Sequence, residues 1–157
     1  MNQRLKWYGL TAVLVVLVDQ ATKWLILVSN PPYYLMRYLT LELTFNRGIS
    51  WGLFSRSSSE VFLTVSILIA VLTLILGMYA YGRYRKGLAI VPEVLIIAGS
   101  CSNLIDRVIH GGVVDFIVVH YETYFWPVFN IADMCIVIGV MGLFFRQLTE
   151  KELHPKA

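Results

Sequence analysis

Two aspartates in the second half of the chain could perform acid–base chemistry. Asp133 lies in FNIADM (residues 129–134), within an apolar run that covers residues 126–145. An ionised carboxylate inside hydrocarbon costs about 2.5–3.5 kcal/mol on insertion scales, so a carboxylate in such a run is a functional candidate by default. Asp115 lies in VVDF, beyond the end of the preceding apolar run, and should approach the same membrane boundary from outside. We therefore predict that the two carboxylates meet near that boundary.

Paired carboxylates have a known use in acid–base catalysis. When two lie close together they cannot both ionise cheaply, so one pKa rises and the pair tends to share a proton. The shared proton supplies one general base and one general acid at the same pH, as in aspartic proteases. The base activates water, and the acid protonates the carbonyl oxygen or the leaving amine. Three amides and one guanidinium are expected to surround the pair and hold the substrate backbone or a developing oxyanion: Asn46, Asn103, Asn130 and Arg107.

Helical spacing predicts how Asp133 is presented. Asn130 precedes it by three residues, which puts the two side chains on one helix face. Pro127 suits the start of a helix. Asp133 should then lie about two turns inside that helix, or about 9–10 Å from its start at 1.5 Å per residue. This depth corresponds to the outer leaflet rather than to the middle of the membrane.

A second helix carries polar residues on one face. Gly99, Asn103 and Arg107 follow one another at intervals of four residues. Asp106, next to Arg107, is expected to cap the end of this helix and to stay at the membrane interface.

A third apolar run contains an acid and a base. Asp19 and Lys23 are four residues apart, so they share a helix face and are expected to form an internal ion pair. Two readings stay open beside a role in the site: the pair could only fix helix packing, or Lys23 could extend outward alone to the interface.

The elements that position these residues are membrane helices. The chain has 157 residues, enough for one domain, and is 57% hydrophobic but only 15% charged, against about 25% charged in a typical soluble domain. Crossing a bilayer takes about 20 helical residues. The sequence predicts a single membrane-embedded domain over residues 1–157 with outer connections at 29–60 and 105–125 and with four spans, at about residues 8–28, 61–81, 88–104 and 126–145.

The flanking charges predict the orientation of the spans. Eight of the thirteen Lys and Arg residues lie before the first span, between the second and third, or after the fourth: Arg4, Lys6, Arg83, Arg85, Lys86, Arg146, Lys151 and Lys156. Positive residues favour the cytoplasmic side, so both termini should be cytoplasmic and the polar cluster extracytoplasmic. In the first outer connection, apolar residues alternate with polar ones over residues 39–46, which indicates a strand. Residues 113–119 could pair with it or lie flat at the interface.

Other functions fit the sequence less well. Neither the zinc motif HExxH nor the serine motif GxSxG occurs. His110 could in principle serve Ser100 or Ser102, but those serines belong to a close-packing helix face. The net charge of +3 is small and no basic block indicates nucleic-acid binding. Buried acids and bases also mark ion paths, so a small ion- or proton-coupled transporter component is the alternative. The almost wholly apolar inner halves of the second and fourth spans and the lack of an internal repeat count against it.

Four motifs in series resemble a known family. They are DQxTK (Asp19, Gln20, Thr22, Lys23), NRGISWG (46–52), GSCSNLIDRVIHGGVVDF (99–116) and FNIAD (129–133), and together they resemble the bacterial lipoprotein signal peptidase, signal peptidase II. The resemblance covers essentially the whole chain. Two departures are GSCSN, where the family often has a glycine- and alanine-rich run, and Ser50, where alanine is commoner. Neither departure affects the two aspartates.

The resemblance implies an all-α integral membrane protein, with four transmembrane helices and a small extracytoplasmic β-cradle, in the bacterial inner membrane. It implies an aspartic endopeptidase that removes the signal peptide of diacylglyceryl-modified prolipoproteins, cuts before the lipidated cysteine and is inhibited by globomycin. By motif, the catalytic residues are Asp115 and Asp133, and the supporting positions are Asp19, Lys23, Asn46, Gly99, Asn103, Arg107 and Asn130. We expect no cofactor, no metal and no nucleic-acid partner, and a monomer in contact with membrane lipid.

Overall fold

A computed structural model describes residues 3–29, 31–48 and 59–153 of the chain. Residues 49–52 of the NRGISWG motif, Ser50 among them, lie outside the described residues, as does Lys156. The protein is mostly helical, with one small antiparallel sheet.

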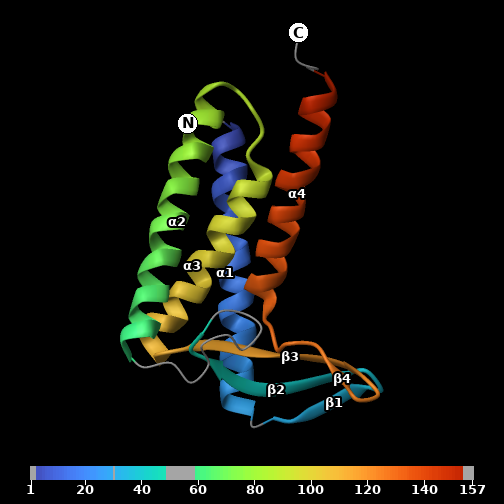
Figure 1. Cartoon of the computed structure of the whole chain (residues 1–157). Helices are drawn as coiled ribbons and strands as arrows, with labels where there is room; N and C mark the ends of the chain where they lie inside the picture. Colours follow the sequence, from blue (N-terminus) through green and yellow to red (C-terminus); the bar gives the residue numbers. More distant parts are fainter. Residues whose placement is uncertain (1–2, 30, 49–58, 154–157) are drawn as a thin grey trace.

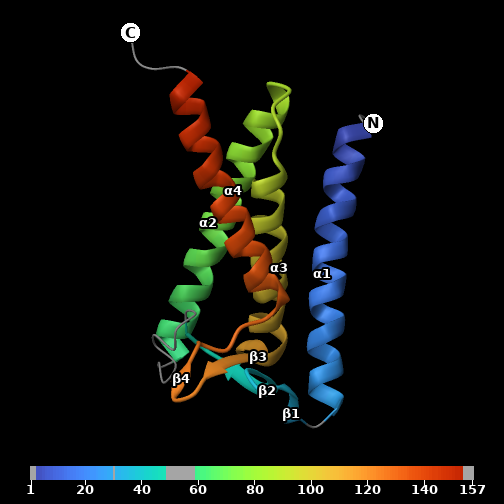
Figure 2. The ribbon, with the colours of Figure 1, turned by 90° about the vertical axis from the view of Figure 1, so that its right-hand side faces the viewer.

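Four helices run alongside one another: α1 (Gln3–Ser29), α2 (Ser59–Arg85), α3 (Val91–His110) and α4 (Ile131–Leu153). The start of α1 and the end of α4 lie at one end of the bundle, here named the terminal end (Figure 1). The sheet lies across the opposite end, named the sheet end. Helix α3 contacts each of the other three helices, and Figure 2 shows α1 and α2 on opposite sides of it.

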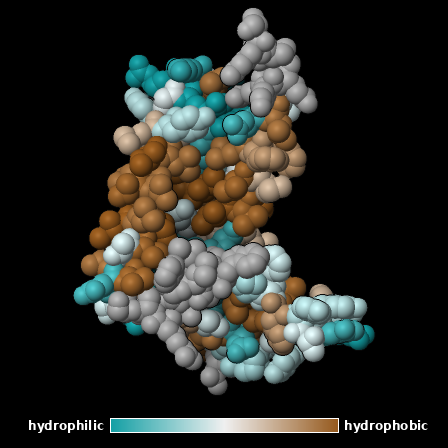
Figure 3. All heavy atoms as spheres, in the orientation of Figure 1, coloured by the Kyte–Doolittle hydropathy of each residue, from teal (hydrophilic) through white to brown (hydrophobic). Residues whose placement is uncertain are grey.

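The surface of the helices is that of a membrane protein. Hydrophobic side chains form a band across the helices, and hydrophilic ones gather towards the terminal end and on the sheet (Figure 3). Three helices have the length and apolarity of a membrane span: α1, α2 and α4. Helix α3 has 20 residues but carries three charged residues along its length, Glu93, Asp106 and Arg107. All three are buried against neighbouring elements, because α3 is the central helix.

Helix α4 begins later than the sequence predicts. The expected start near residue 126 is wrong, because α4 begins at Ile131. The chain before it is extended, and Phe129 pairs with Ile117 through two backbone hydrogen bonds of 2.8 and 3.2 Å. Asp133 consequently lies in the first turn of its helix and not two turns inside it. Because the backbone of Phe129 is already hydrogen-bonded to Ile117, the helix can begin only beyond it, and Asn130 is the capping residue that precedes the helix.

The sheet joins both outer connections. Its strands are β1 (Tyr33–Met36), β2 (Leu39–Asn46), β3 (Val113–Tyr121) and β4 (Tyr124–Phe125), in the antiparallel order β1-β2-β3-β4. The strand predicted from the alternation over residues 39–46 is confirmed. The open question about residues 113–119 has a clear answer, since β3 pairs with β2 and sets Asp115 opposite Thr44. At the end of α3, Gly111 adopts the left-handed conformation (φ +64°) that ends many helices, and the chain turns there into β3.

Helices α3 and α4 approach closely because glycines stand at their contact. A Cβ atom placed on Gly99 would lie 2.6 Å from the backbone oxygen of Ala132, and one placed on Gly139 would lie 2.7 Å from that of Pro92. Small residues at such contacts let membrane helices pack backbone to backbone. The role of Gly99 in the structure is therefore this approach, which brings the start of α4 against α3.

Candidate active site

The FNIAD motif forms the start of α4. The amide oxygen of Asn130 accepts a hydrogen bond from the backbone N–H of Asp133 at 2.9 Å. The carboxylate of Asp133 accepts one in return from the backbone N–H of Asn130, at 3.4 Å. This reciprocal pattern is a capping box, which satisfies backbone donors at a helix start and fixes both side chains. The carboxylate of Asp133 is thus held at the helix end and directed towards the sheet end of the bundle.

Asp115 meets this cap from strand β3. Its side chain is buried, with 2% of its surface exposed. Its two carboxylate oxygens accept hydrogen bonds from the amides of Asn130, at 2.7 Å, and of Asn46, at 3.0 Å. Burial, together with the nearby negative charge of Asp133, raises the pKa of Asp115 to about 7, although the two asparagine bonds and Lys23 act in the opposite direction. The structure therefore brings the two predicted carboxylates into electrostatic contact.

Asn103 connects Asp133 to the polar residues of α1. Its amide nitrogen donates to Asp133 at 2.8 Å. Its amide oxygen accepts hydrogen bonds from Lys23, at 2.9 Å, and from Asn130, at 3.1 Å. Each carboxylate of the pair thus receives an N–H from a different asparagine, and Lys23 holds the amide of Asn103 in the orientation that this requires.

A buried ion cluster supports these asparagines. The ammonium group of Lys23 lies 2.6 Å from Asp19 and 2.7 Å from Asp106. With Asn103 as the third acceptor, all three donors of this ammonium have partners. The predicted ion pair of Asp19 and Lys23 is confirmed. The alternative that Lys23 reaches the surface is wrong, because only 2% of its side chain is exposed.

The expectation that Asp106 stays at the membrane interface is also wrong. Its side chain is 1% exposed and accepts hydrogen bonds from Gln20 at 2.8 Å and from the backbone N–H of Val114 at 3.0 Å, besides its contact with Lys23. Sequence reasoning missed this role and that of Gln20. The sequence did contain a signal for it. The ammonium group of Lys23 has three hydrogen-bond donors, and the predicted ion pair gave it only one acid as a partner. Asp106 thus connects α1 to the start of β3 and helps to fix the position of the next residue on that strand, Asp115.

Asp19 links α1 to α4. One of its oxygens accepts the backbone N–H of Ala132 at 2.8 Å, and the other accepts the hydroxyl of Ser102 at 2.7 Å. Ser102 is therefore fully engaged as a donor in a buried network, whereas His110 is exposed and its ring lies near that of Phe45. The structure does not bring His110 to either predicted serine, since Ser100 and Ser102 precede it by ten and eight residues of the same helix, or about 12–15 Å at 1.5 Å per residue, and this removes the serine alternative.

Arg107 is the last of the four polar residues predicted to surround the two aspartates. Its guanidinium donates to the backbone oxygen of Gly48 at 2.8 Å, while its Nε has no hydrogen-bond partner among the described residues. Asn46, on the neighbouring strand, accepts the N–H of Gly48 at 2.9 Å and donates to Asp115.

Over residues 3–29, 31–48 and 59–153, no three His, Cys, Asp or Glu side chains could hold a metal ion together.

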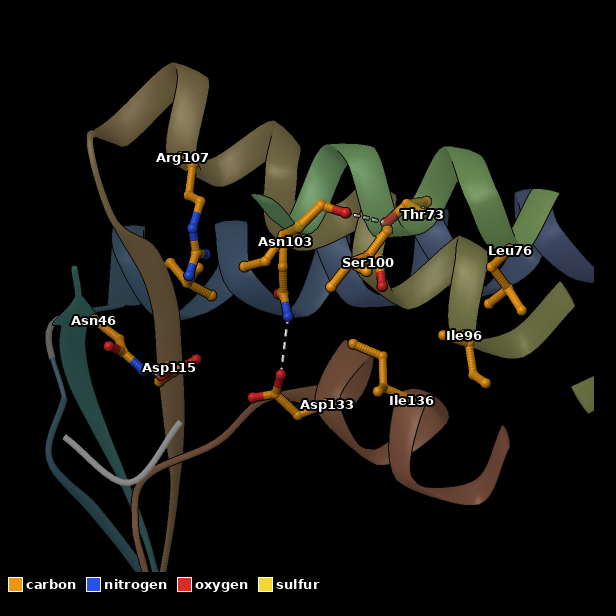
Figure 4. A pocket seen from close by; sticks show the side chains of 13 residues that line it. Asn46, Thr73, Leu76, Ile96, Ser100, Asn103, Arg107, Asp115, Asp133 and Ile136 are labelled. Atoms are coloured by element: carbon orange, nitrogen blue, oxygen red, sulfur yellow. Dashed lines mark hydrogen bonds between the residues drawn. The ribbon is translucent and has the colours of Figure 1, made fainter. Parts of the chain in front are cut away.

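The polar cluster lines one end of a cavity of about 320 Å³. The rest of the same cavity is mostly apolar and is here named the groove. Figure 4 shows Arg107, Asn46 and Asp115 at one end of the cavity and Leu76 and Ile96 at the other, with Asp133 and Ile136 between them. Helices α2 and α4 supply its walls and α3 supplies its floor. A cavity of this size with a few polar groups at one end is typical of ligand sites.

Asp133 also borders a second cavity. This one measures about 450 Å³ and is lined almost wholly by apolar residues from the chain before α4 and from α4 itself: Trp126, Pro127, Val128, Phe129, Met134, Val137 and Ile138. Asp133 therefore borders both cavities, a feature that the sequence did not predict.

Comparison with known proteins decides the family. The family described as signal peptidase (SPase) II matches residues 11–149 of this chain. The lipoprotein signal peptidase of Rhodopseudomonas palustris is 37% identical over 150 residues, which cover 88% of this chain and 90% of that protein. The chain belongs to the signal peptidase II family. The resemblance seen in the four motifs is thereby confirmed.

Further similarities extend over nearly the whole chain. The lipoprotein signal peptidase of Methylorubrum extorquens is 39% identical over 156 residues, which cover 94% of this chain and 89% of that protein. Among solved structures, a bacterial membrane enzyme determined by the in meso method is similar with a TM-score of 0.74 and 29% identity, covering 96% of this chain and 92% of that one. By name these relatives are peptidases or a bacterial membrane enzyme, and they do not favour the transporter alternative.

Proposed function

We propose that this member of the signal peptidase II family is an aspartic endopeptidase that removes the signal peptide from diacylglyceryl-modified prolipoproteins and cuts before the lipidated cysteine. Asp115 and Asp133 form the catalytic pair. One observation carries the proposal: a buried carboxylate from β3 and a partly buried one from α4 border the same cavity, and each accepts an N–H from an asparagine. The supporting positions are Asp19, Lys23, Asn46, Gly99, Asn103, Arg107 and Asn130.

The two carboxylates take different roles at neutral pH. In the proposed mechanism Asp115, whose pKa burial and the charge of Asp133 raise to about 7, carries the shared proton at the start of the reaction. Asp133 then acts as the base: it takes a proton from water as the water oxygen attacks the scissile carbonyl carbon, and Asp115 gives its proton to the carbonyl oxygen. When the tetrahedral intermediate breaks its C–N bond, the proton held by Asp133 passes to the leaving nitrogen, and the proton on the hydroxyl returns to Asp115. The positive charge of Arg107 at the same end of the cavity stabilises negative charge that develops on the oxygen.

The two cavities suit a substrate with two apolar parts. On the amino-terminal side of the scissile bond, a signal peptide has an apolar segment of about 7–15 residues. On the other side, the diacylglyceryl group of the cysteine supplies two acyl chains. We assign the apolar segment to the groove between α2, α3 and α4, and the acyl chains to the cavity between Trp126 and Ile138. Asp133 borders both, as a residue at the junction of the two parts must.

The proposed placement has all four helices in the bacterial inner membrane. Helix α3 crosses with the others, since its charged side chains are buried and form ion pairs or hydrogen bonds. The terminal end faces the cytoplasm, in keeping with the Arg and Lys residues at its helix ends, and the sheet end with the site is extracytoplasmic. The chain works as a monomer in contact with lipid, needs no cofactor or metal for the steps above, and binds globomycin-type inhibitors.

The test is cleavage of a diacylglyceryl-modified prolipoprotein peptide by the protein reconstituted in liposomes. Asp115→Asn and Asp133→Asn should each lower kcat by about 10³-fold or more, because each removes one of two groups that act as a unit. Glu42→Gln, an exposed site on β2, is the matched control and should keep full activity. Thermal unfolding and binding of the uncleaved peptide confirm that each variant is folded. Full activity in either aspartate variant would refute the proposed pair.

A further inference from the structure

A second buried ion cluster lies far from the proposed catalytic pair, at the terminal end. Glu93, in the first turn of α3, is completely buried. Arg146 of α4 donates two hydrogen bonds to its carboxylate, at 2.7 and 3.1 Å. Arg83 of α2 has its Nε 3.6 Å from the same carboxylate. A forked pair of charged hydrogen bonds is among the stronger and more directional polar contacts, so one side chain joins three helices here.

The two helices that carry the arginines of this cluster, α2 and α4, are also the walls of the groove. Leu72 and Leu76 line the groove from α2, and Asp133 and Ile136 line it from α4. Within residues 3–29, 31–48 and 59–153, no Cα atom of α2 lies within 8 Å of a Cα atom of α4. The spacing of the walls therefore depends on how each is attached to α3, and Glu93 is bound to both.

Both walls are held firmly beside Glu93. On α4, a Cβ atom placed on Gly142 would lie 3.0 Å from the ring of Pro92, the neighbour of Glu93. On α2, Ala80 is buried in a small apolar core with Ile90 and Val94, which flank Glu93 in the chain. The helices are thus packed together at this end and border an open groove nearer the sheet.

The cluster is too far away to touch the reacting atoms. Glu93 precedes Asn103, which binds Asp133, by ten residues of one helix, or about 15 Å at 1.5 Å per residue. An apolar segment of about 7–15 residues forms a helix about 10–22 Å long. A substrate segment of that length would therefore extend along the groove from the catalytic pair to the level of Glu93.

We propose that Glu93 is a positioning residue for substrate: through Arg83 and Arg146 it sets the spacing of α2 and α4, and with it the fit of the groove to the apolar segment of the signal peptide. This inference rests on the proposed function. Arg83 and Arg146 both approach the same oxygen of Glu93, so without the carboxylate two guanidinium groups would lie close together with no negative charge between them. The walls then separate, and binding of the apolar segment weakens while the chemistry of the catalytic pair is unaffected.

The experiment compares two substrates with the full chain in liposomes. One is a diacylglyceryl-modified peptide with its complete apolar segment, and the other keeps the lipid and the residues around the scissile bond but lacks that segment. For Glu93→Gln we expect KM for the complete substrate to rise about tenfold with kcat retained, which is the signature of lost ground-state binding. KM for the short substrate should stay the same. A role in stability alone would lower the yield of active enzyme and affect both substrates equally.

Two variants of α2 provide a matched pair for this experiment. Arg83→Gln removes one partner of Glu93 and should give part of the same selective rise in KM, whereas Arg85→Gln, at an exposed site two residues later, should give none. If Glu93→Gln does not fold, the result for Arg83→Gln decides. An unchanged KM for the complete substrate, or an equal loss with both substrates, would overturn the inference. A wild-type protein that cleaves neither substrate would instead refute the proposed function.

Discussion

Removing the amide of Asn46 should move the pH dependence of cleavage in a direction that the structure defines. In the wild type this amide donates to Asp115 at 3.0 Å, and the bond favours the ionised carboxylate. It therefore lowers the pKa of Asp115, which burial and Asp133 raise to about 7. In Asn46→Ala this opposing contact is gone, so the pKa of Asp115 should rise further.

The size of the change follows from the strength of one hydrogen bond to a charged group. Such a bond contributes about 1.5–3 kcal/mol, and one unit of pKa corresponds to about 1.36 kcal/mol. The neutral carboxyl group keeps part of the bond energy and Asn130 still donates at 2.7 Å, so we take the lower end, a rise of about one unit. In the proposed mechanism Asp115 must carry a proton to start the reaction, so activity should fall as the pH rises through its pKa. The alkaline limb of kcat/KM should then move from about pH 7 to about pH 8.

The assay is the pH profile of kcat/KM for the lipid-modified peptide, since this quantity reports the pKa values of the free enzyme. Asn46→Asp is a second variant, because it keeps the oxygen that accepts the N–H of Gly48 at 2.9 Å and places a like charge beside Asp115. Its alkaline limb should also move to higher pH. Glu42→Gln, exposed on the same strand, should leave the profile unchanged. A limb that stays in place or moves to lower pH in Asn46→Ala would refute Asp115 as the proton donor.

Two further predictions concern the packing that holds the site. Gly99→Ala should lower the free energy of unfolding by about 1–3 kcal/mol, because the new methyl group would lie 2.6 Å from the backbone oxygen of Ala132 and force α3 and α4 apart. Gly82→Ala, with nothing within 4 Å of the added carbon, should be neutral or slightly stabilising in thermal unfolding, and equal stability of the two variants would contradict the close approach. Lys23→Met should cost about 3–5 kcal/mol, since it leaves two buried carboxylates without their cation. Lys6→Met, at an exposed site, should unfold at the wild-type temperature, and a Lys23 variant that did the same would show that the cluster is not buried.

Local patterns in the sequence were enough to predict the elements and the candidate residues. The apolar runs predicted the helices, because the length of a membrane span is set by the thickness of hydrocarbon. The alternation of residues predicted β2 with both of its ends, Leu39 and Asn46, because side chains of a strand alternate between two faces. The spacing of Asp19 and Lys23 predicted their ion pair, because four residues bring side chains together on one helix.

The tertiary structure decided what depends on partners distant in the sequence. Helix α4 starts at Ile131 and not earlier, because the backbone of Phe129 is already paired with Ile117 on β3. The burial of Asp106 depends on Lys23, which lies on another helix.

Glu93 shows the same limit at the other end of the bundle. In the sequence it is a single acid near the start of a helix, and its two partners come from helices on either side, at Arg83 and Arg146. Spacing along one helix predicts which side chains share a face. Which faces meet, and so which buried charge finds its counter-charge, is set only when the helices pack, because a charge removed from water is stable there only beside a partner.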